Sequence, residues 1–181
     1  AGESTGYEDF TVRSLQTIHG PENGALEHAL DDYIDTHNSN VWLSNAIVEA
    51  TFTNPYSTTE GEWDSGFQLR DSVSSSHIIV IHSSKYWTHD IYTDIGWKEL
   101  ESNNSPNIKT LGGETNHIRV IALDDEGWLF INGVPDQKKL DLSGHSERGF
   151  ANLITNFINS HGIEGKSTKF EGFTVWSVGT E

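Results

Sequence analysis

Aromatic, histidine and carboxylate side chains gather in the middle of the sequence in a combination that suits sugar binding. A pyranose ring stacks its apolar CH face on tryptophan or tyrosine, while carboxylates and amides take its hydroxyl groups. A second interpretation stays open, because Trp87 and Tyr92 could instead pack in a core or against a sheet. The predicted ligand-binding residues are Trp63, Asp64, Arg70, His82, Tyr86, Trp87, Tyr92 and Trp97.

Closely spaced aspartates are the residues that could hold a metal ion. Calcium takes several oxygen ligands from one loop or from adjacent loops. Asp31, Asp32 and Asp35 are the predicted ligands, although their spacing does not match an EF-hand. Asp124 and Asp125 are explained more simply as turn residues. Calcium is therefore the only cofactor that the sequence suggests.

Three alternating carboxylates, Glu60, Glu62 and Asp64, would share one face of a strand with spacings near ~6.5 Å. Glycosidases need two carboxylates about 5–5.5 Å apart for retention, or about 6.5–9.5 Å apart for inversion. Gly61, beside a turn, argues against a rigid catalytic strand here. We therefore expect that the chain is not an enzyme and rank glycoside hydrolysis third among its functions.

The length and the charge of the chain limit the classes of protein to which it can belong. The chain has 181 residues, which predicts one β-sandwich domain over residues 1–181. Acidic residues outnumber basic ones 27 to 11, giving a formal charge of -16 that repels nucleic acids and anionic membranes. No apolar run approaches the roughly 20 residues of a membrane-spanning helix. The sequence has no methionine and starts at Ala1, so either a leader has been removed or the chain has been trimmed. We expect the first, and with it a protein that is secreted or at the cell surface.

A three-stranded antiparallel meander over residues 115–143 is the clearest structural signal. His117–Leu123 is rich in β-branched residues, and residues 124–127 form a polar turn that ends in glycine. Trp128–Ile131 is the second strand. Asn132-Gly133 is a strong hairpin signal, and Val134–Leu142 returns as the third strand.

Further strands are expected on both sides of this meander. Residues 8–15 resemble residues 171–178, with Phe-Thr-Val in common, so we predict that the two ends of the chain lie near each other. Val41–Thr53 is predicted as one long strand that Asn54-Pro55 ends. His77–His82 has four consecutive apolar residues inside it, which predicts a strand covered on both faces by a loop, a ligand groove or another subunit.

Three further stretches are not predicted as strands from their residue pattern. His28–Asn40 is polar and is predicted as loops, and Trp97–Pro106 as a polar excursion. In Phe150–Ile158 the apolar residues fit a helical period, although several of the residues between them are poor helix formers. Periodicity alone therefore favours a helix for this last stretch.

Short motifs resemble those of concanavalin A-like, or laminin G-like, jelly-roll domains in bacterial extracellular proteins. They are Gly61-Glu62-Trp63-Asp64-Ser65-Gly66-Phe67-Gln68-Leu69-Arg70, the hairpin pair Asn116–Val120 and Leu129–Gly133, and the closing strand Lys166–Trp176. The resemblance spans the chain from about Val41 and implies an all-β, two-sheet antiparallel sandwich with paired terminal strands. It also implies that Phe150–Ile158 is a strand. The catalytic E-x-D-x-x-E motif of jelly-roll glucanases is not matched.

The fold serves lectins, polysaccharide-binding modules, glucanases and adhesive surface proteins, so function has to come from the site. We expect a non-catalytic extracellular module that binds a carbohydrate or another ligand on a cell surface. The alternative is a structural subunit of a surface assembly or fibre. In that case the strand at 77–82 and outward residues such as Trp128 and Phe130 would be covered by self-association.

Overall fold

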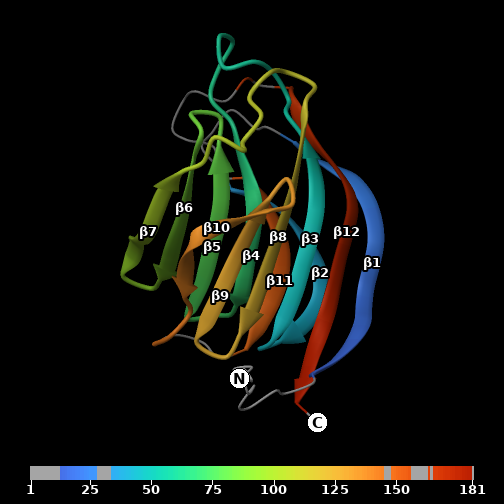
Figure 1. The fold of residues 1–181 in the computed structure, drawn as a ribbon, viewed down its shortest axis with the longest axis vertical. Helices are drawn as coiled ribbons and strands as arrows, with labels where there is room; N and C mark the ends of the chain where they lie inside the picture. Colours follow the sequence, from blue (N-terminus) through green and yellow to red (C-terminus); the bar gives the residue numbers. More distant parts are fainter. Residues whose placement is uncertain (1–12, 28–33, 145–147, 156–162, 164, 181) are drawn as a thin grey trace, which may run out of the picture.

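The computed structural model describes residues 13–27, 34–144, 148–155, 163 and 165–180, which form β-strands and connecting turns without a helix. The ribbon in Figure 1 shows two layers of strands, one in front of the other. The strands are β1 (Arg13–Glu27), β2 (Asp35–Leu43), β3 (Ala46–Thr53), β4 (Asp64–Asp71), β5 (Ser75–His82), β6 (Tyr86–Thr93), β7 (Gly96–Asn104), β8 (Thr115–Leu123), β9 (Glu126–Ile131), β10 (Val134–Asp141), β11 (Gly149–Thr155) and β12 (Ser167–Thr180).

The strands form two antiparallel sheets of six. Sheet A has the order β1-β12-β3-β8-β9-β10, and sheet B has the order β2-β11-β4-β5-β6-β7. Strands that are neighbours in a sheet are often distant in sequence, as when β11 lies between β2 and β4. This is the two-sheet antiparallel jelly-roll sandwich that the motifs implied, so the predicted fold class is confirmed.

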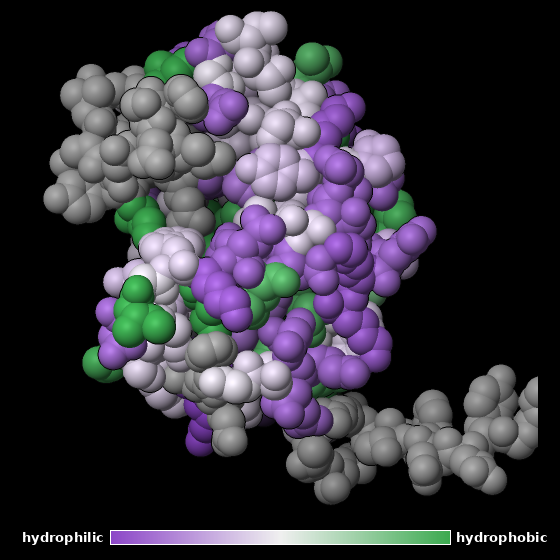
Figure 2. Space-filling view, turned by 90° about the vertical axis from the view of Figure 1, so that its left-hand side faces the viewer, coloured by the Kyte–Doolittle hydropathy of each residue, from purple (hydrophilic) through white to green (hydrophobic). Residues whose placement is uncertain are grey.

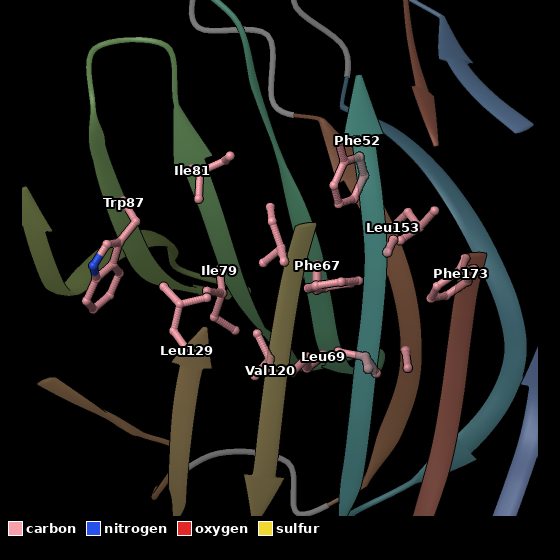
Figure 3. Packing of buried hydrophobic residues seen from close by; sticks show 14 of the residues in the cluster. Phe52, Phe67, Leu69, Ile79, Ile81, Trp87, Val120, Leu129, Leu153 and Phe173 are labelled. Atoms are coloured by element: carbon pink, nitrogen blue, oxygen red, sulfur yellow. The ribbon is translucent and has the colours of Figure 1, made fainter. Parts of the chain in front are cut away.

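The hydrophobic core fills the space between the two sheets. Figure 3 shows Phe67 of β4 and Phe173 of β12 pointing into this space from opposite layers. Their ring centroids are 6.5 Å apart, and Phe67 also meets Phe52 edge-on with centroids 6.0 Å apart. On β8, β9 and β3 every second residue is buried, because alternate side chains of a strand point to opposite faces of its sheet.

The predicted meander is confirmed as β8, β9 and β10. Its second turn has φ angles of 53° at Asn132 and 80° at Gly133, the left-handed region that this pair of residues adopts readily. Asn132 also uses its side chain, since its Oδ1 accepts a hydrogen bond from the His117 backbone N–H at 2.9 Å. The prediction that the two ends of the chain lie near each other is confirmed for the described residues, because Arg13 of β1 pairs with Thr180 of β12.

The predicted single strand over residues 41–53 is wrong, because the chain changes sheets at Ser44 and Asn45. β2 ends at Leu43 in sheet B, and β3 begins at Ala46 in sheet A. The Asn45 side chain fixes the crossing: its Oδ1 accepts from the Asp124 backbone N–H at 2.7 Å, and its Nδ2 donates to Asp124 Oδ1 at 3.0 Å. A polar residue at a sheet junction thus interrupts an apolar pattern that looks continuous in the sequence.

Two stretches predicted as loops are edge strands. Residues 35–40 belong to β2 and residues 97–104 to β7, the two outer strands of sheet B. Edge strands need few apolar residues because water covers one of their sides, which explains the missed signal.

The helix favoured by periodicity is also wrong over residues 149–155, where β11 lies between two strands and is buried on both faces. The strand implied by the resemblance is confirmed there, and residues 156–158 lie outside the described part.

Candidate ligand-binding face

Sheet B presents one face to the core and the other away from it. On β5, His77, Ile79 and Ile81 alternate with Ile78, Val80 and His82, and all six are buried. Ile79 and Ile81 belong to the main core, whereas Ile78 and Val80 form a separate small cluster with Ile154 of β11. The prediction that this strand is buried on both faces is confirmed.

Strand register lines up polar and aromatic side chains on the outer side of β4–β7. Asp64 lies opposite His82, Asp90 lies between Ile78 and Glu99, and Tyr92 lies between Ser76 and Trp97. A one-residue bulge at Leu100 of β7 sets this register. We call this surface the carboxylate–aromatic face and define it by Asp64, His82, Tyr86, Thr88, Asp90, Tyr92, Trp97 and Glu99.

An exposed aromatic pair lies at one end of the carboxylate–aromatic face. The Tyr92 and Trp97 side chains are 45% and 46% exposed, and their ring centroids are 5.4 Å apart at an interplanar angle of 58°. Figure 2 looks at the side of the molecule on which β6 and β7 lie, and hydrophilic residues cover much of it. Two solvent-accessible rings in a polar surrounding leave an apolar surface on which a ligand can stack.

A hydrogen-bonded chain of three side chains runs across the centre of the face. The Thr88 hydroxyl donates to Asp90 Oδ2 at 2.9 Å and lies 3.1 Å from His82 Nε2. Since the single hydroxyl proton goes to Asp90, the His82 Nε2–H donates to Thr88 and Nδ1 carries the lone pair. That Nδ1 atom is buried and accepts no hydrogen bond within the described part of the chain. The His82 ring stacks on Tyr86 with centroids 4.2 Å apart.

Burial and negative charge set the protonation states on this face. Burial lowers the pKa of His82 to about 4, so its ring is neutral at pH 7. Burial, with a smaller contribution from Glu99, raises the pKa of Asp90. The pKa of Tyr86 is raised by burial first, and then by the charges of Glu62, Asp64, Glu99 and Asp90. Tyr86 therefore lies in a field of carboxylates.

A second polar group on the same side of sheet B joins β4, β5 and β11. Gln68 Nε2 donates to Asp71 Oδ1 and to Ser76 Oγ, both at 3.0 Å, and Asn152 Nδ2 donates to Asp71 Oδ2 at 3.0 Å. Burial raises the pKa of Asp71, and the hydrogen bond from Asn152 partly offsets this. This group could not be predicted from the sequence, because its members meet only through strand register.

The structure brings five of the predicted binding residues together and places three elsewhere. Asp64, His82, Tyr86, Tyr92 and Trp97 share the carboxylate–aromatic face, although Asp64 and His82 are themselves buried, so that only Tyr86, Tyr92 and Trp97 among the five reach solvent. Trp63 and Trp87 are core residues, 3% and 0% exposed, and neither can offer its ring to a ligand in solvent. Arg70 is buried and donates to the backbone carbonyls of Ser44, Leu142 and Asp124. For these three residues the predicted binding role is corrected to a structural one.

The carboxylates proposed for hydrolysis do not share a strand. Only Asp64 lies in β4, while Glu60 lies in the preceding turn and accepts hydrogen bonds from the Ser57 backbone N–H and hydroxyl. Asp90 and Glu99, which the sequence pattern did not single out as a pair, lie directly opposite each other on β6 and β7. Opposed residues on antiparallel strands have Cβ atoms about 4.5–5.5 Å apart.

The predicted calcium site stays a prediction. Asp31 and Asp32 lie outside the described residues, and Asp35 Oδ2 accepts a hydrogen bond from the Glu27 backbone N–H at 2.7 Å. Within the described ranges no group of three or more histidine or carboxylate residues is arranged to hold a metal ion. Those ranges also contain no helix long and apolar enough to cross a membrane.

Comparison with known proteins defines the class of fold. No family model and no curated protein matches the sequence. Among solved structures, the carbohydrate-binding module CBM66 from Bacillus subtilis is 12% identical, with a TM-score of 0.64 over 90% of this chain and 95% of that chain. The galectin LEC-6 from Caenorhabditis elegans is 8% identical, with a TM-score of 0.52 over 86% and 94%. The chain thus has the concanavalin A-like jelly-roll fold, as the motifs implied.

A third similar structure corrects the expectation that this chain is not an enzyme. A glycoside hydrolase family 16 endo-glucanase from Bacteroides ovatus is 12% identical, with a TM-score of 0.56 over 95% of this chain and 96% of that chain. Several of the similar structures are glycoside hydrolases, so the fold occurs with and without catalysis. At such identities the likeness extends to the fold alone.

Proposed function

We propose that this protein binds a carbohydrate on the carboxylate–aromatic face. The observation that carries the proposal is the exposed pair Tyr92 and Trp97, which lies beside the opposed carboxylates Asp90 and Glu99. Similar folds in a carbohydrate-binding module and a galectin support it. An extracellular location of the protein is part of the same proposal. Self-association remains a prediction of the sequence.

Sugar binding on this face divides into an apolar and a polar part. The CH face of a pyranose stacks on Trp97 or Tyr92, and its hydroxyl groups donate to Asp90 and Glu99 one step along the same strands. Rigid strands rather than loops hold these groups, so little conformational freedom is lost on binding.

Replacing Trp97 with alanine should weaken binding of a soluble glycan oligomer by about fivefold, because a stacking interaction of roughly 1 kcal/mol is lost. Titration calorimetry measures the change. Trp42→Ala is the matched control, since the Trp42 side chain is 47% exposed and lies on β2, at the opposite edge of sheet B. Equal affinities of the Trp97→Ala and Trp42→Ala variants would contradict the proposed face.

A second function, hydrolysis of a glycosidic bond, is favoured by one specific observation. Asp90 and Glu99 face each other across two strands, and the Cβ separation of such a pair suits the roughly 5–5.5 Å between carboxyl groups in retaining glycosidases. Burial raises the pKa of Asp90, which suits a general acid. Glu99, which accepts a hydrogen bond from the Ser102 hydroxyl at 2.9 Å, would then be the nucleophile.

If the chain cleaves a glycan, Asp90→Asn should lower kcat at least about 100-fold, the range in which general acid catalysis contributes. The rate of the unchanged protein should fall as pH rises through the raised pKa of Asp90, because the acid must be protonated to act. Release of reducing ends from oligosaccharides measures both effects. A cleaving activity that survives Asp90→Asn would remove Asp90 and Glu99 from this role.

A further inference from the structure

We infer that the carboxylate–aromatic face selects glycans that carry positively charged amino groups. This inference rests on the proposed function and names the class of sugar that the face takes. An ammonium group beside exposed rings and carboxylates is attracted by both, since the ring face and the carboxylate are each negative. Three arguments support the inference: the sign of the charged residues on the face, their position relative to the aromatic rings, and the repulsion that an anionic sugar would meet there.

Strand register places four charged residues on the outer side of β4–β7 in the described part of the chain, and all four are acidic. The exposed Lys98 of β7 lies opposite Ile91 and therefore on the other side of the sheet. Asp64 and Asp71 come from β4, Asp90 comes from β6, and Glu99 comes from β7. The outward histidine, His82, is neutral at pH 7 because burial lowers its pKa. The remaining described positions that register places on this side of β4–β7 are uncharged.

The aromatic pair and the carboxylate pair lie one step apart along the same two strands. Tyr92 is paired with Trp97 just as Asp90 is paired with Glu99, and two residues of a strand advance about 6.6 Å. A substituent of a stacked pyranose ring, together with one charge-assisted hydrogen bond, spans about that distance from the ring centre. An amino group on a sugar stacked on Trp97 would therefore meet Asp90 and Glu99.

Anionic sugars are disfavoured by the same geometry. A uronate or sulfate group in that position would be repelled by Asp90 and Glu99, because all of these groups are negative. The protein as a whole, with a formal charge of -16, adds to this repulsion. A neutral sugar would keep stacking and hydrogen bonding but would gain nothing from charge. The expected order of affinity is therefore cationic, then neutral, then anionic.

The test is titration calorimetry at pH 5.5 with four hexamers: β-1,4-linked glucosamine, its N-acetylated form, β-1,4-linked glucose and a uronic acid. Two ion pairs, one with half-buried Asp90 and one with exposed Glu99, should make the glucosamine hexamer bind about tenfold more tightly than the two neutral hexamers at 50 mM salt. The preference should shrink in 300 mM salt, because screening weakens exposed charge pairs. This salt dependence needs no variant and holds whether or not a variant folds.

A double variant, Asp90→Asn with Glu99→Gln, should lose the preference for the amine. Asp125→Asn with Glu126→Gln is the matched control: it removes the same two residue types at the β8–β9 turn of sheet A and should keep the preference. Binding of the neutral hexamers as tightly as the amine would overturn this inference and leave the proposed function in place. No binding of any of the four hexamers would overturn both.

Discussion

Replacing Arg70 with methionine should lower the free energy of unfolding by about 3–5 kcal/mol, the loss seen when one partner of a buried charged network is removed. The Arg70 guanidinium is buried where the two sheets meet. Its Nη1 donates to the Leu142 carbonyl at 3.0 Å, its Nε to that of Ser44 at 3.3 Å, and its Nη2 to that of Asp124. Methionine keeps the apolar stem but leaves these carbonyls without their charged donor. Urea unfolding followed by fluorescence measures the change.

Arg119→Met is the matched control for the loss of one arginine charge. Arg119 lies on the outer side of sheet A, where it pairs with Glu49 and is 45% exposed. Exposed pairs of this kind contribute less than about 1 kcal/mol, so this variant should stay close to the unchanged protein. If the two variants unfold at the same urea concentration, Arg70 does not hold the sheet junction together.

The second large effect is expected for Trp87→Ala, which should destabilise the fold by about 3–5 kcal/mol. The Trp87 side chain is fully buried in the core, and its Nε1–H donates to Asp136 Oδ2 of β10 at 2.8 Å. The substitution therefore creates a large cavity and removes a hydrogen bond between sheet B and sheet A. Thermal or urea unfolding, followed by circular dichroism, measures the loss.

Trp87→Phe separates the two parts of this effect. Phenylalanine keeps most of the buried ring but cannot donate to Asp136, so a loss of about 1–3 kcal/mol is expected from the small gap and from Asp136 Oδ2, which loses its donor while Oδ1 keeps those of Asn103 and Lys138. Trp128→Ala, on the half-buried outer side of β9, should cost less than Trp87→Ala. A Trp87→Ala variant as stable as Trp128→Ala would show that Trp87 is not a core residue.

Much of the fold could be predicted because its signals are local. The Asn132-Gly133 turn and the alternation in β8 and β9 each depend on residues within a few positions of one another. The apolar run in β5 likewise predicted burial on both faces, because its residues are adjacent in the sequence. The crossing at Ser44 and Asn45 could not be predicted, since it depends on a contact with Asp124, which is far away in the sequence.

The binding face was only partly predictable because neighbouring residues of a strand point to opposite sides. Tyr86 and Trp87 are adjacent, yet one lies on the carboxylate–aromatic face and the other in the core. Composition locates such a cluster but does not sort its members by side. Glu99 was missed for another reason: its stretch was predicted as a polar excursion, and only the strand β7 places it opposite Asp90.

The bulge at Leu100 has a consequence for how these molecules meet one another at high concentration. β7 is an outer strand of sheet B, and a regular outer strand offers its free backbone groups to a strand of another molecule. The extra residue breaks the even spacing that such a partner would need. Lateral growth into fibrils from this edge is thereby discouraged.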